Sequence, residues 1–337
     1  MKSNISRRSF LKGGLAAAGA AAASSVPAPP SVRAGTGREL ATLIDIRKCV
    51  GCGACVEACQ EANGAKFPRP KKPFPKMYPS KVKVSDWSDK RHVTDRLTPY
   101  NWVFIQEATV TVDGGPKTLT FPRRCMHCQN PPCADLCPWG AASKLENGIT
   151  LIQPDICLGG AKCQTVCPWH IPQRQTGTGL YLDLLPSLAG NGVMYKCDRC
   201  YQRIAAGQAP ACIEACPEGA QKIGPREAIR QEAHELARSI NGYIYGETEN
   251  GGTNTFYVSP VPFDELNKAI AKGDGRPHLQ PVENSMGRAD NLAKAMLIAP
   301  FAGLAAAVGK FYKNHKSEER PEKMMNSEHP GREEEEK

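Results

Sequence analysis

Short apolar runs separated by turn residues predict several short strands and helices instead of one large sheet. Residues 40–45, 149–153 and 253–258 have the length and apolar content of strands. Residues 100–106 and 109–112 predict the two arms of an inserted hairpin. Residues 224–240 open with Pro225, are rich in Glu, Ala and Arg, and predict a helix. Many prolines and lysines in residues 64–80 predict a wrapping surface loop.

The first 34 residues have the pattern of an export signal. They begin Ser6-Arg7-Arg8-Ser9-Phe10-Leu11-Lys12, continue with an Ala/Gly-rich apolar stretch and end on the small-residue cleavage pattern Val32-Arg33-Ala34. The paired arginines resemble the twin-arginine signal, whose pathway exports proteins already folded around a cofactor. The alternative is a basic N-terminal tail with two chance arginines.

A second apolar segment lies near the other end of the chain. Residues 295–309 carry no charge, and the span 291–312 reaches the length of a membrane anchor if Lys294 and Lys310 extend their ammonium groups to the interface. The lysines and Arg320 that follow place the C-terminus in the cytoplasm by the positive-inside rule. An interfacial helix and a buried core helix are the alternatives. Residues 313–337 then form a charged cytoplasmic tail.

The charge of the chain is not that of a nucleic-acid-binding protein. Its formal net charge is +9, but residues 1–34 hold five basic side chains and no acid, so 38 basic and 34 acidic side chains remain after them. In no stretch do basic and aromatic residues alternate as they do in single-strand binders. We therefore predict no nucleic-acid partner.

Fifteen cysteines in 337 residues are the feature that decides the chemistry. They form four runs, each ending on two cysteines separated by three residues, as in bacterial ferredoxins. The runs are Cys49-x2-Cys52-x2-Cys55-x3-Cys59, Cys125-x2-Cys128-x4-Cys133-x3-Cys137, Cys157-x5-Cys163-x3-Cys167 and Cys197-x2-Cys200-x11-Cys212-x3-Cys216.

The spacing predicts which cysteines share a cluster. Three cysteines on a tight loop can wrap one cubane, and the last cysteine of a run serves the second cluster of a pair. We pair the second run with the third, which are neighbours, and the first with the fourth. The predicted ligand sets are Cys49, Cys52, Cys55 with Cys216; Cys197, Cys200, Cys212 with Cys59; Cys125, Cys128, Cys133 with Cys167; and Cys157, Cys163 with Cys137. Together these sets use all fifteen cysteines.

The fourth set lacks one thiolate because Gly160 stands where the run would have its second cysteine. Three thiolates favour a [3Fe-4S] cluster, so the sequence predicts three [4Fe-4S] clusters and one [3Fe-4S] cluster. A [4Fe-4S] cluster whose fourth iron holds water or hydroxide is the alternative, and an empty site is a third. Zinc sites also use paired cysteines, but seldom in runs of this form. A disulfide framework fits closely spaced runs poorly.

A few residues near the runs allow more than one role. We expect Trp139 and Trp169, which follow two Cys-Pro pairs, to pack and exclude water from clusters. His127 could donate a hydrogen bond to sulfur or face solvent. Lys196, Arg199 and Arg203 could offset cluster charge or meet solvent. No P-loop, dinucleotide-binding, zincin or nucleophile-elbow motif occurs in the chain, and this argues against catalysis within it.

The cysteine runs and the twin-arginine pattern resemble the iron–sulfur subunits of molybdopterin-oxidoreductase and membrane hydrogenase complexes. Residues 245–253 (Tyr-Gly-Glu-Thr-Glu-Asn-Gly-Gly-Thr) and 259–263 (Ser-Pro-Val-Pro-Phe) are similar to the hydrogenase-2 iron–sulfur subunit and to that of the high-molecular-weight cytochrome complex. Both families place one hydrophobic helix near the C-terminus, and the hydrogenase-2 type has cysteine where this chain has Gly160. The resemblance covers roughly residues 40–312.

The sequence and the resemblance predict an α+β fold of tandem bacterial-ferredoxin-like modules with inserted loops and one C-terminal hydrophobic helix. The expected domains are a signal peptide (1–34), a four-cluster domain (35–290, with its cluster core at 40–225 and an extension at 226–290), an anchor (291–312) and a tail (313–337).

The expected function is that of a non-catalytic electron-transfer subunit on the periplasmic side of the inner membrane. By resemblance, its partners are a hydrogenase, multihaem cytochrome c or molybdopterin catalytic subunit and a quinone-reactive integral membrane subunit. A self-sufficient redox enzyme and a cluster-bearing assembly or sensor protein are the alternatives.

Overall fold

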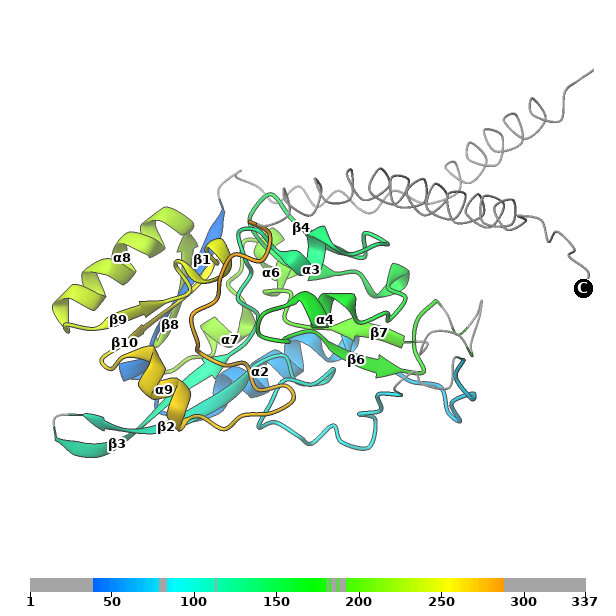
Figure 1. Cartoon of the computed structure of the whole chain (residues 1–337), viewed down its shortest axis with the longest axis horizontal. Coiled ribbons are helices and arrows are strands. Elements are labelled where there is room, and N and C mark those ends of the chain that lie inside the picture. The colour runs from blue at the N-terminus through cyan, green and yellow to red at the C-terminus, as the bar shows by residue number, and fades with distance from the viewer. Residues whose placement is uncertain are drawn as a thin grey trace, which may run out of the picture.

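The structure is a computed structural model that describes residues 39–287, except 79–83, 113, 181, 183–186 and 188–191. Figure 1 shows the four-stranded sheet at one end, the β6–β7 ribbon at the other and α2 between them. The strands are β1 (Leu40–Asp45), β2 (Phe104–Val112), β3 (Gly115–Arg123), β4 (Ala142–Lys144), β5 (Thr150–Ile152), β6 (Gln173–Thr176), β7 (Gly192–Tyr195), β8 (Gln221–Pro225), β9 (Tyr243–Tyr245) and β10 (Thr255–Ser259). The α-helices are α2 (Ala54–Asn63), α3 (Pro132–Asp135), α4 (Lys162–Val166), α6 (Tyr201–Ala205), α7 (Ala211–Glu214), α8 (Arg226–Ser239) and α9 (Phe263–Ala269). The 3-10 turns are η1 (Ile46–Lys48), η2 (Gly64–Lys66), η3 (Pro154–Ile156) and η4 (Glu249–Gly251).

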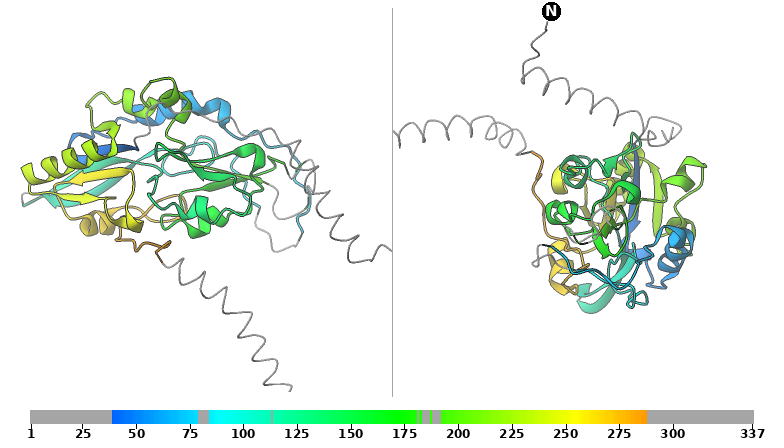
Figure 2. Two further views of the ribbon diagram at one scale, coloured as in Figure 1. Left: turned by 90° about the horizontal axis from the view of Figure 1, so that it is seen from above. Right: turned by 90° about the vertical axis from the view of Figure 1, so that its right-hand side faces the viewer.

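The four-stranded sheet has the order β8-β1-β10-β9, with β1 parallel to β10 and antiparallel to β8. Successive side chains of β1 point to opposite faces, as the pleat requires. Ala41 and Leu43 pack under α8, whereas Ile44 faces the core that holds the cysteines. The helix α8 therefore covers one face, and the other face supports the cysteine loops (Figure 2).

Most predicted elements are confirmed. The strand at 40–45 is β1, the strand at 149–153 contains β5, the strand at 253–258 overlaps β10, and the helix at 224–240 contains α8. The predicted loop at 64–80 begins with η2, and residues 67–77 after it have no helix or strand. The loop reaches the β6–β7 ribbon through a hydrogen bond from the Lys71 amide to the Gly177 carbonyl (2.8 Å). The mixture of short strands and helices fits the predicted α+β class.

The predicted hairpin was wrong in its arms. Residues 104–112 form one continuous strand, β2, whose partner is β3 and not the segment before it. The predicted break fails because Ala108 is buried in the core and Glu107 pairs with Thr120. The chain instead turns at Gly114, whose φ of +80° suits glycine.

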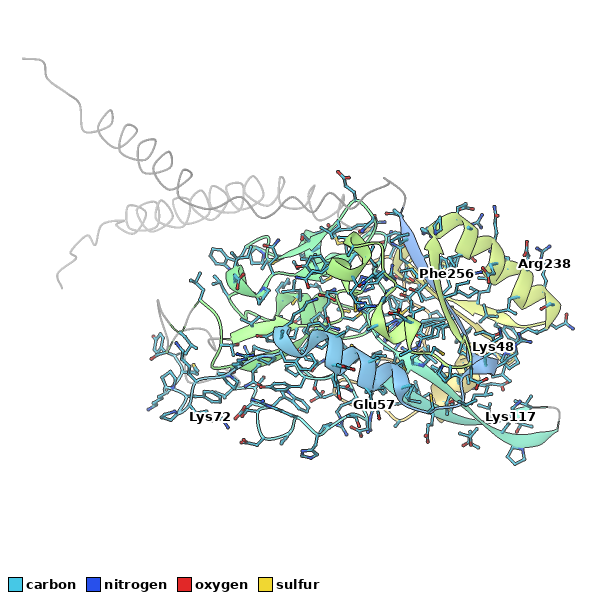
Figure 3. The ribbon with its side chains drawn as sticks, turned by 180° about the vertical axis from the view of Figure 1, so that it is seen from behind. Lys48, Glu57, Lys72, Lys117, Arg238 and Phe256 are labelled. Atoms are coloured by element: carbon cyan, nitrogen blue, oxygen red, sulfur yellow. The ribbon has the colours of Figure 1, made fainter. Side chains whose placement is uncertain are left out.

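The cysteines are part of the core. Ten of them belong to the main cluster of buried residues, together with aromatic side chains such as Phe104 and Tyr257. In Figure 3, seen from behind, α2 crosses the front of the molecule with Glu57 on its exposed side. Cys55 and Cys59 lie on the buried side of the same helix. Thiol side chains therefore make up a large part of the buried core.

The predicted signal peptide (1–34), anchor (291–312) and tail (313–337) lie outside the described residues. Within the described part of the chain, no helix is long and apolar enough to cross a bilayer.

Candidate metal centres

The first centre is a cavity of about 330 Å³ formed by the loop between β1 and α2 and by the end of the fourth cysteine run. Its cysteines are Cys49, Cys52, Cys55 and Cys216. Gly51 and Gly53 adopt φ values of +71° and +79°, which let the loop curl around the cavity. The Thr120 hydroxyl donates to the Cys49 carbonyl at 2.8 Å and ties this loop to β3. Cys52 is exposed, so this centre reaches the surface.

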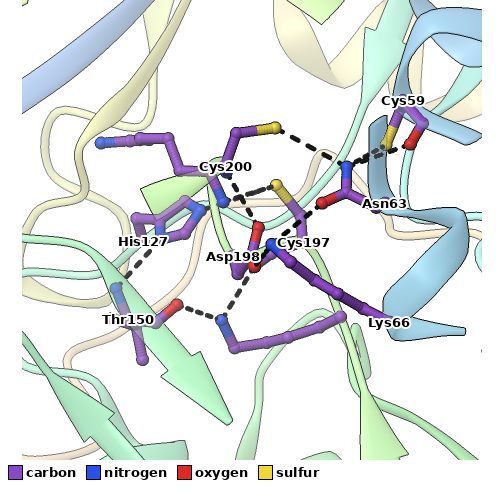
Figure 4. A network of polar contacts seen from close by, with 10 residues as sticks. Cys59, Asn63, Lys66, His127, Thr150, Cys197, Asp198 and Cys200 are labelled. Carbon is purple, nitrogen blue, oxygen red and sulfur yellow. Dashed lines mark hydrogen bonds and ion pairs between the residues drawn. The ribbon is translucent and has the colours of Figure 1, made fainter. Parts of the chain in front are cut away.

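The second centre is a cavity of about 340 Å³ lined by Cys59, Cys197, Cys200 and Cys212. Cys59 comes from α2, and the other three cysteines come from the loop before α6 and from α7. All four are buried. The Arg199 amide donates to Cys197 Sγ at 3.3 Å, and the Cys200 amide donates to the carboxylate of Asp198 at 2.8 Å, which fixes the loop (Figure 4).

The third centre is a cavity of about 330 Å³ lined by Cys125, Cys128, Cys133 and Cys167. The first three follow β3 and reach into α3, and Cys167 follows α4. Lys196 and Trp169 also line this cavity. Lys196 is buried, and its Nζ donates to the carbonyls of Thr150 and Cys197, the latter at 3.1 Å. This lysine thus connects the walls of the second and third cavities.

The three cysteines of the fourth set act on one another's ionisation. Burial and then the neighbouring thiols of Cys157 and Cys137 raise the pKa of Cys163 to about 12. The Met194 amide donates to Cys157 Sγ at 3.4 Å, and the Ala142 amide donates to Cys137 Sγ at 3.5 Å. Backbone amides of two different ribbons therefore direct N–H groups at this set.

Glycines around the fourth set have different roles. Gly159 has a φ of +64°, and a Cβ there would lie 2.3 Å from the Gly192 carbonyl oxygen, so no larger residue fits. Gly160 is exposed, and a Cβ there would meet no described atom within 4 Å. The position of the absent cysteine is thus sterically open.

The four sets form a series in space. The thiol of Cys212 in the second set raises the pKa of Cys55 in the first, after the larger effect of burial. Cys125 of the third set acts in the same way on Cys197 of the second. Cys167 of the third set acts on Cys163 of the fourth.

Geometry gives the same order, from the first set to the fourth. The helix α2 contributes Cys55 to the first cavity and Cys59 to the second. Lys196 lines the third cavity and donates to the carbonyl of Cys197 in the second. Cys163 of the fourth set lies on α4, which ends next to Cys167 of the third.

Burial makes these thiols weak acids in the absence of metal. It raises the pKa of Cys55 and of Cys197 to about 12, and that of Cys167 to about 11. Iron binding requires thiolates, so loading such a site must release protons. Four thiols that share one cavity are the donor set of a cubane cluster, and three cavities in the described part of the chain meet that requirement.

Two donors at the second cavity were missed by sequence reasoning. Arg124 is buried, and its Nη1 donates to Cys212 Sγ at 2.8 Å. Asn63 is buried at the end of α2, and its Nδ2 lies 3.7 Å from Cys59 Sγ and 3.6 Å from Cys200 Sγ. The only available signal was sequence adjacency, since Arg124 precedes Cys125 and Asn63 follows Cys59 by one helical turn.

The open choices made for His127 and the basic residues are resolved by burial. His127 is 1% exposed, its Nδ1 accepts from the Thr150 amide at 3.1 Å, and its Nε2 lies 3.8 Å from Cys197 Sγ. The proton must therefore sit on Nε2, which faces the sulfur. Arg199 is also buried, whereas Arg203 is paired with Glu214 near the surface.

Trp139 does not pack against a cluster site, contrary to expectation. It is 61% exposed, whereas Trp169 is 2% exposed and lines the third cavity. Trp169 Nε1 donates to the Tyr245 hydroxyl at 2.8 Å, which gives its buried indole a partner. Trp139 lies in the turn between Cys137 and β4, where no described element covers it.

Comparisons with known proteins support iron–sulfur clusters of the 4Fe-4S type. Residues 48–141 and residues 116–226 match two models described as 4Fe-4S dicluster domains, and residues 4–24 match the twin-arginine translocation pathway signal sequence. The predicted export signal is therefore confirmed at the level of its pathway.

Relatives extend over most of the chain. The Hydrogenase-2 operon protein HybA of Escherichia coli O157:H7 is 29% identical over 356 residues, which cover 92% of this chain and 97% of the relative. The iron–sulfur subunit of the nitrate-inducible formate dehydrogenase of Escherichia coli (strain K12) is 29% identical, with 82% and 86% covered. The probable anaerobic dimethyl sulfoxide reductase chain YnfG of the same strain is 31% identical, with 58% and 77% covered. The chain belongs to the ferredoxin-type, 4Fe-4S dicluster iron–sulfur subunits of respiratory oxidoreductase complexes, which are electron-transfer subunits and not catalytic chains.

Proposed function

We propose that this chain relays electrons through four iron–sulfur clusters in series, three of the [4Fe-4S] type and one of the [3Fe-4S] type. The observation that carries the proposal is that three cavities are each lined by four cysteines drawn from two distant runs. When bound, iron–sulfur clusters accept and release single electrons at potentials tuned by the protein.

The proposed ligands are the four sets expected from the spacing. The first cavity uses Cys49, Cys52, Cys55 and Cys216; the second uses Cys59, Cys197, Cys200 and Cys212; and the third uses Cys125, Cys128, Cys133 and Cys167. Cys137, Cys157 and Cys163 hold the three-iron cluster. The open space at Gly160 supports this last assignment because no described side chain takes the place of a fourth thiolate there.

The two ends of the series suit exchange with partner proteins. Cys52 in the first set is exposed, and Val50 beside it is 62% exposed. At the fourth set, Gly160 is exposed, as are Leu136 and Ile156 beside its cysteines. The inner two cavities are lined by buried cysteines only. Electrons would thus enter at one end and leave at the other.

The partners follow from the relatives and from the resemblance. One end meets a catalytic subunit of the hydrogenase, molybdopterin enzyme or multihaem cytochrome kind. The three-iron end meets a quinone-reactive integral membrane subunit. The chain acts on the periplasmic side of the inner membrane, and residues 291–312 anchor it there, after a signal at 1–34 and before a cytoplasmic tail at 313–337. Residues 35–290 form the cluster domain.

Anaerobic purification of the full chain with its bound partners tests this proposal. We expect about fifteen iron atoms per chain from these cluster stoichiometries, an oxidised three-iron EPR signal, and a large catalytic or cytochrome subunit in equal amount. Zinc in place of iron would contradict the cluster assignment. Substrate turnover by the purified chain alone would instead favour a self-sufficient enzyme, and loaded clusters without any partner would favour a sensor or assembly role.

A further inference from the structure

We propose that the second cavity holds the four-iron cluster of highest potential in this chain and that Arg124 is the positioning residue that sets this potential. The inference rests on the proposed function, because it requires a cluster in that cavity. It concerns how three sites that each have four cysteine ligands come to differ.

Side-chain N–H groups reach all four thiols of the second cavity. Arg124 donates to Cys212, Asn63 lies within donating distance of both Cys59 and Cys200, and His127 directs its Nε2 at Cys197. Figure 4 shows Asn63 and His127 approaching this cavity from different elements. Hydrogen bonds to the sulfurs stabilise the more negative, reduced cluster and therefore raise its potential.

Arg124 adds a full positive charge that proton loss cannot remove. Its side chain is only 4% exposed, and its Nη2 is buried with no partner among the described residues. A buried guanidinium nitrogen without a partner is costly, so its place in the wall of this cavity points to an acceptor there. A cluster sulfide would be that acceptor.

The other two four-cysteine cavities have fewer side-chain donors to their sulfurs. Among the described residues, no side chain donates to a sulfur of the first set. In the third set, the side chain of Asn250 forms a hydrogen bond with Cys128. Lys196 also lines this cavity, but its Nζ donates to two backbone carbonyls. Asp198 brings a negative charge near the second cavity, but Lys66 pairs with it at 2.6 Å. The balance of side-chain donors therefore favours the second cavity.

An interior four-iron site of highest potential has a consequence for the relay. An electron that passes between the first and the third cluster comes to rest at the second cluster before it moves on. Arg124 also lies close enough to Cys55 to act on it, so its charge reaches the first cluster more weakly. The charge of one arginine would thus shape the potential profile of the first half of the relay.

A redox titration followed by EPR on the anaerobically purified full chain tests the inference. In Arg124→Gln we expect the reduced-to-oxidised ratio of the highest-potential four-iron component, at a fixed applied potential, to fall at least tenfold, which is a shift of 59 mV for one electron. Arg124→Lys keeps the charge and should recover part of the shift. Asn63→Leu removes the side-chain donor to Cys59 and Cys200 and should lower the potential of the same component. Arg203→Gln is the matched control. Arg203 is also basic and follows Cys200 of the second set, but its guanidinium pairs with Glu214.

The possible results separate a failure of this inference from a failure of the proposed function. If Arg124→Gln and Asn63→Leu leave every potential unchanged, or shift different components, the inference is overturned while the proposed function stands. If the wild-type chain contains no four-iron clusters, the proposed function fails and the inference fails with it. If Arg124→Gln does not accumulate as folded protein, the inference stands only if Asn63→Leu and Arg124→Lys lower the potential of the highest-potential four-iron component.

Discussion

Cys55 and Cys59 lie one turn apart on α2, yet their thiols line different cavities. Four residues advance a helix by about 6 Å and keep both side chains on one face. The helix therefore acts as a shared wall, with one thiol at each of two neighbouring sites. Cys163 and Cys167 repeat the relation at α4, between the fourth set and the third cavity.

This relation predicts that the two cysteines of α2 can be separated by mutation. Cys55→Ala should alter the EPR component of the first cluster, and Cys59→Ala should alter that of the second, because each removes one ligand from a different cavity. Redox titration of both variants measures which component changes. A common effect of both variants on one component would contradict the assignment of α2 to two sites.

Gly160→Cys should convert the proposed three-iron cluster into a four-iron cluster. The substitution meets no steric obstacle among the described residues and supplies the absent thiolate. We expect the oxidised three-iron EPR signal to disappear and the iron content to rise by about one atom per chain. Gly115→Cys on β3 is the control, because a Cβ there is equally unhindered but lies in a hairpin without cluster cysteines. An unchanged spectrum in Gly160→Cys would exclude our ligand set.

The two tryptophans that follow Cys-Pro pairs should differ strongly on truncation. Trp169→Ala removes a buried indole and the donor to Tyr245, so we expect a loss of about 3–5 kcal/mol and faster loss of cluster absorbance in air. Trp139→Ala, at an exposed position, should change stability by less than about 0.5 kcal/mol. Anaerobic denaturant unfolding compares the two variants. Equal losses would mean that Trp139 is covered in solution.

Stability should fall on mild acidification, in part through His278. Burial, followed by the charges of Arg123 and His170, lowers its pKa below 6.5 even though the Pro168 carbonyl accepts from Nε2. Its Nδ1 accepts from the Gln280 amide, a bond that a second ring proton would break. The unfolded state therefore binds the proton more readily, and the stability contributed by neutral His278 is lost as the pH falls through about 6.5.

The variant His278→Gln measures this contribution. We expect its denaturation midpoint to change less between pH 7.5 and pH 5.5 than that of the unmodified chain, whereas exposed His92→Gln should keep the full dependence. If His278→Gln and the unmodified chain lose stability in parallel over this range, another group carries the effect.

Local sequence predicted the elements that have strong local signals. β1 was predicted to the residue, and α8 was found from Pro225 and its run of helix-forming residues. The hairpin failed because the break expected between residues 106 and 109 lies inside β2, where pairing with β3 keeps Gln106 and Glu107 in a strand. Burial of Ala108 by distant residues outweighed the local preference.

The sequence alone determined the kind of chemistry, because metal-ligand spacing is a local property of a few residues on one loop. It also marked the site of the absent thiolate at Gly160. Only the tertiary structure decided the surroundings of the thiols, because burial and charge depend on segments far apart in the chain. Arg124 meets Cys212 across 88 positions, and His127 meets Cys197 across 70. Trp139 and Trp169 share the same local sequence context, yet the packed fold exposes one and buries the other.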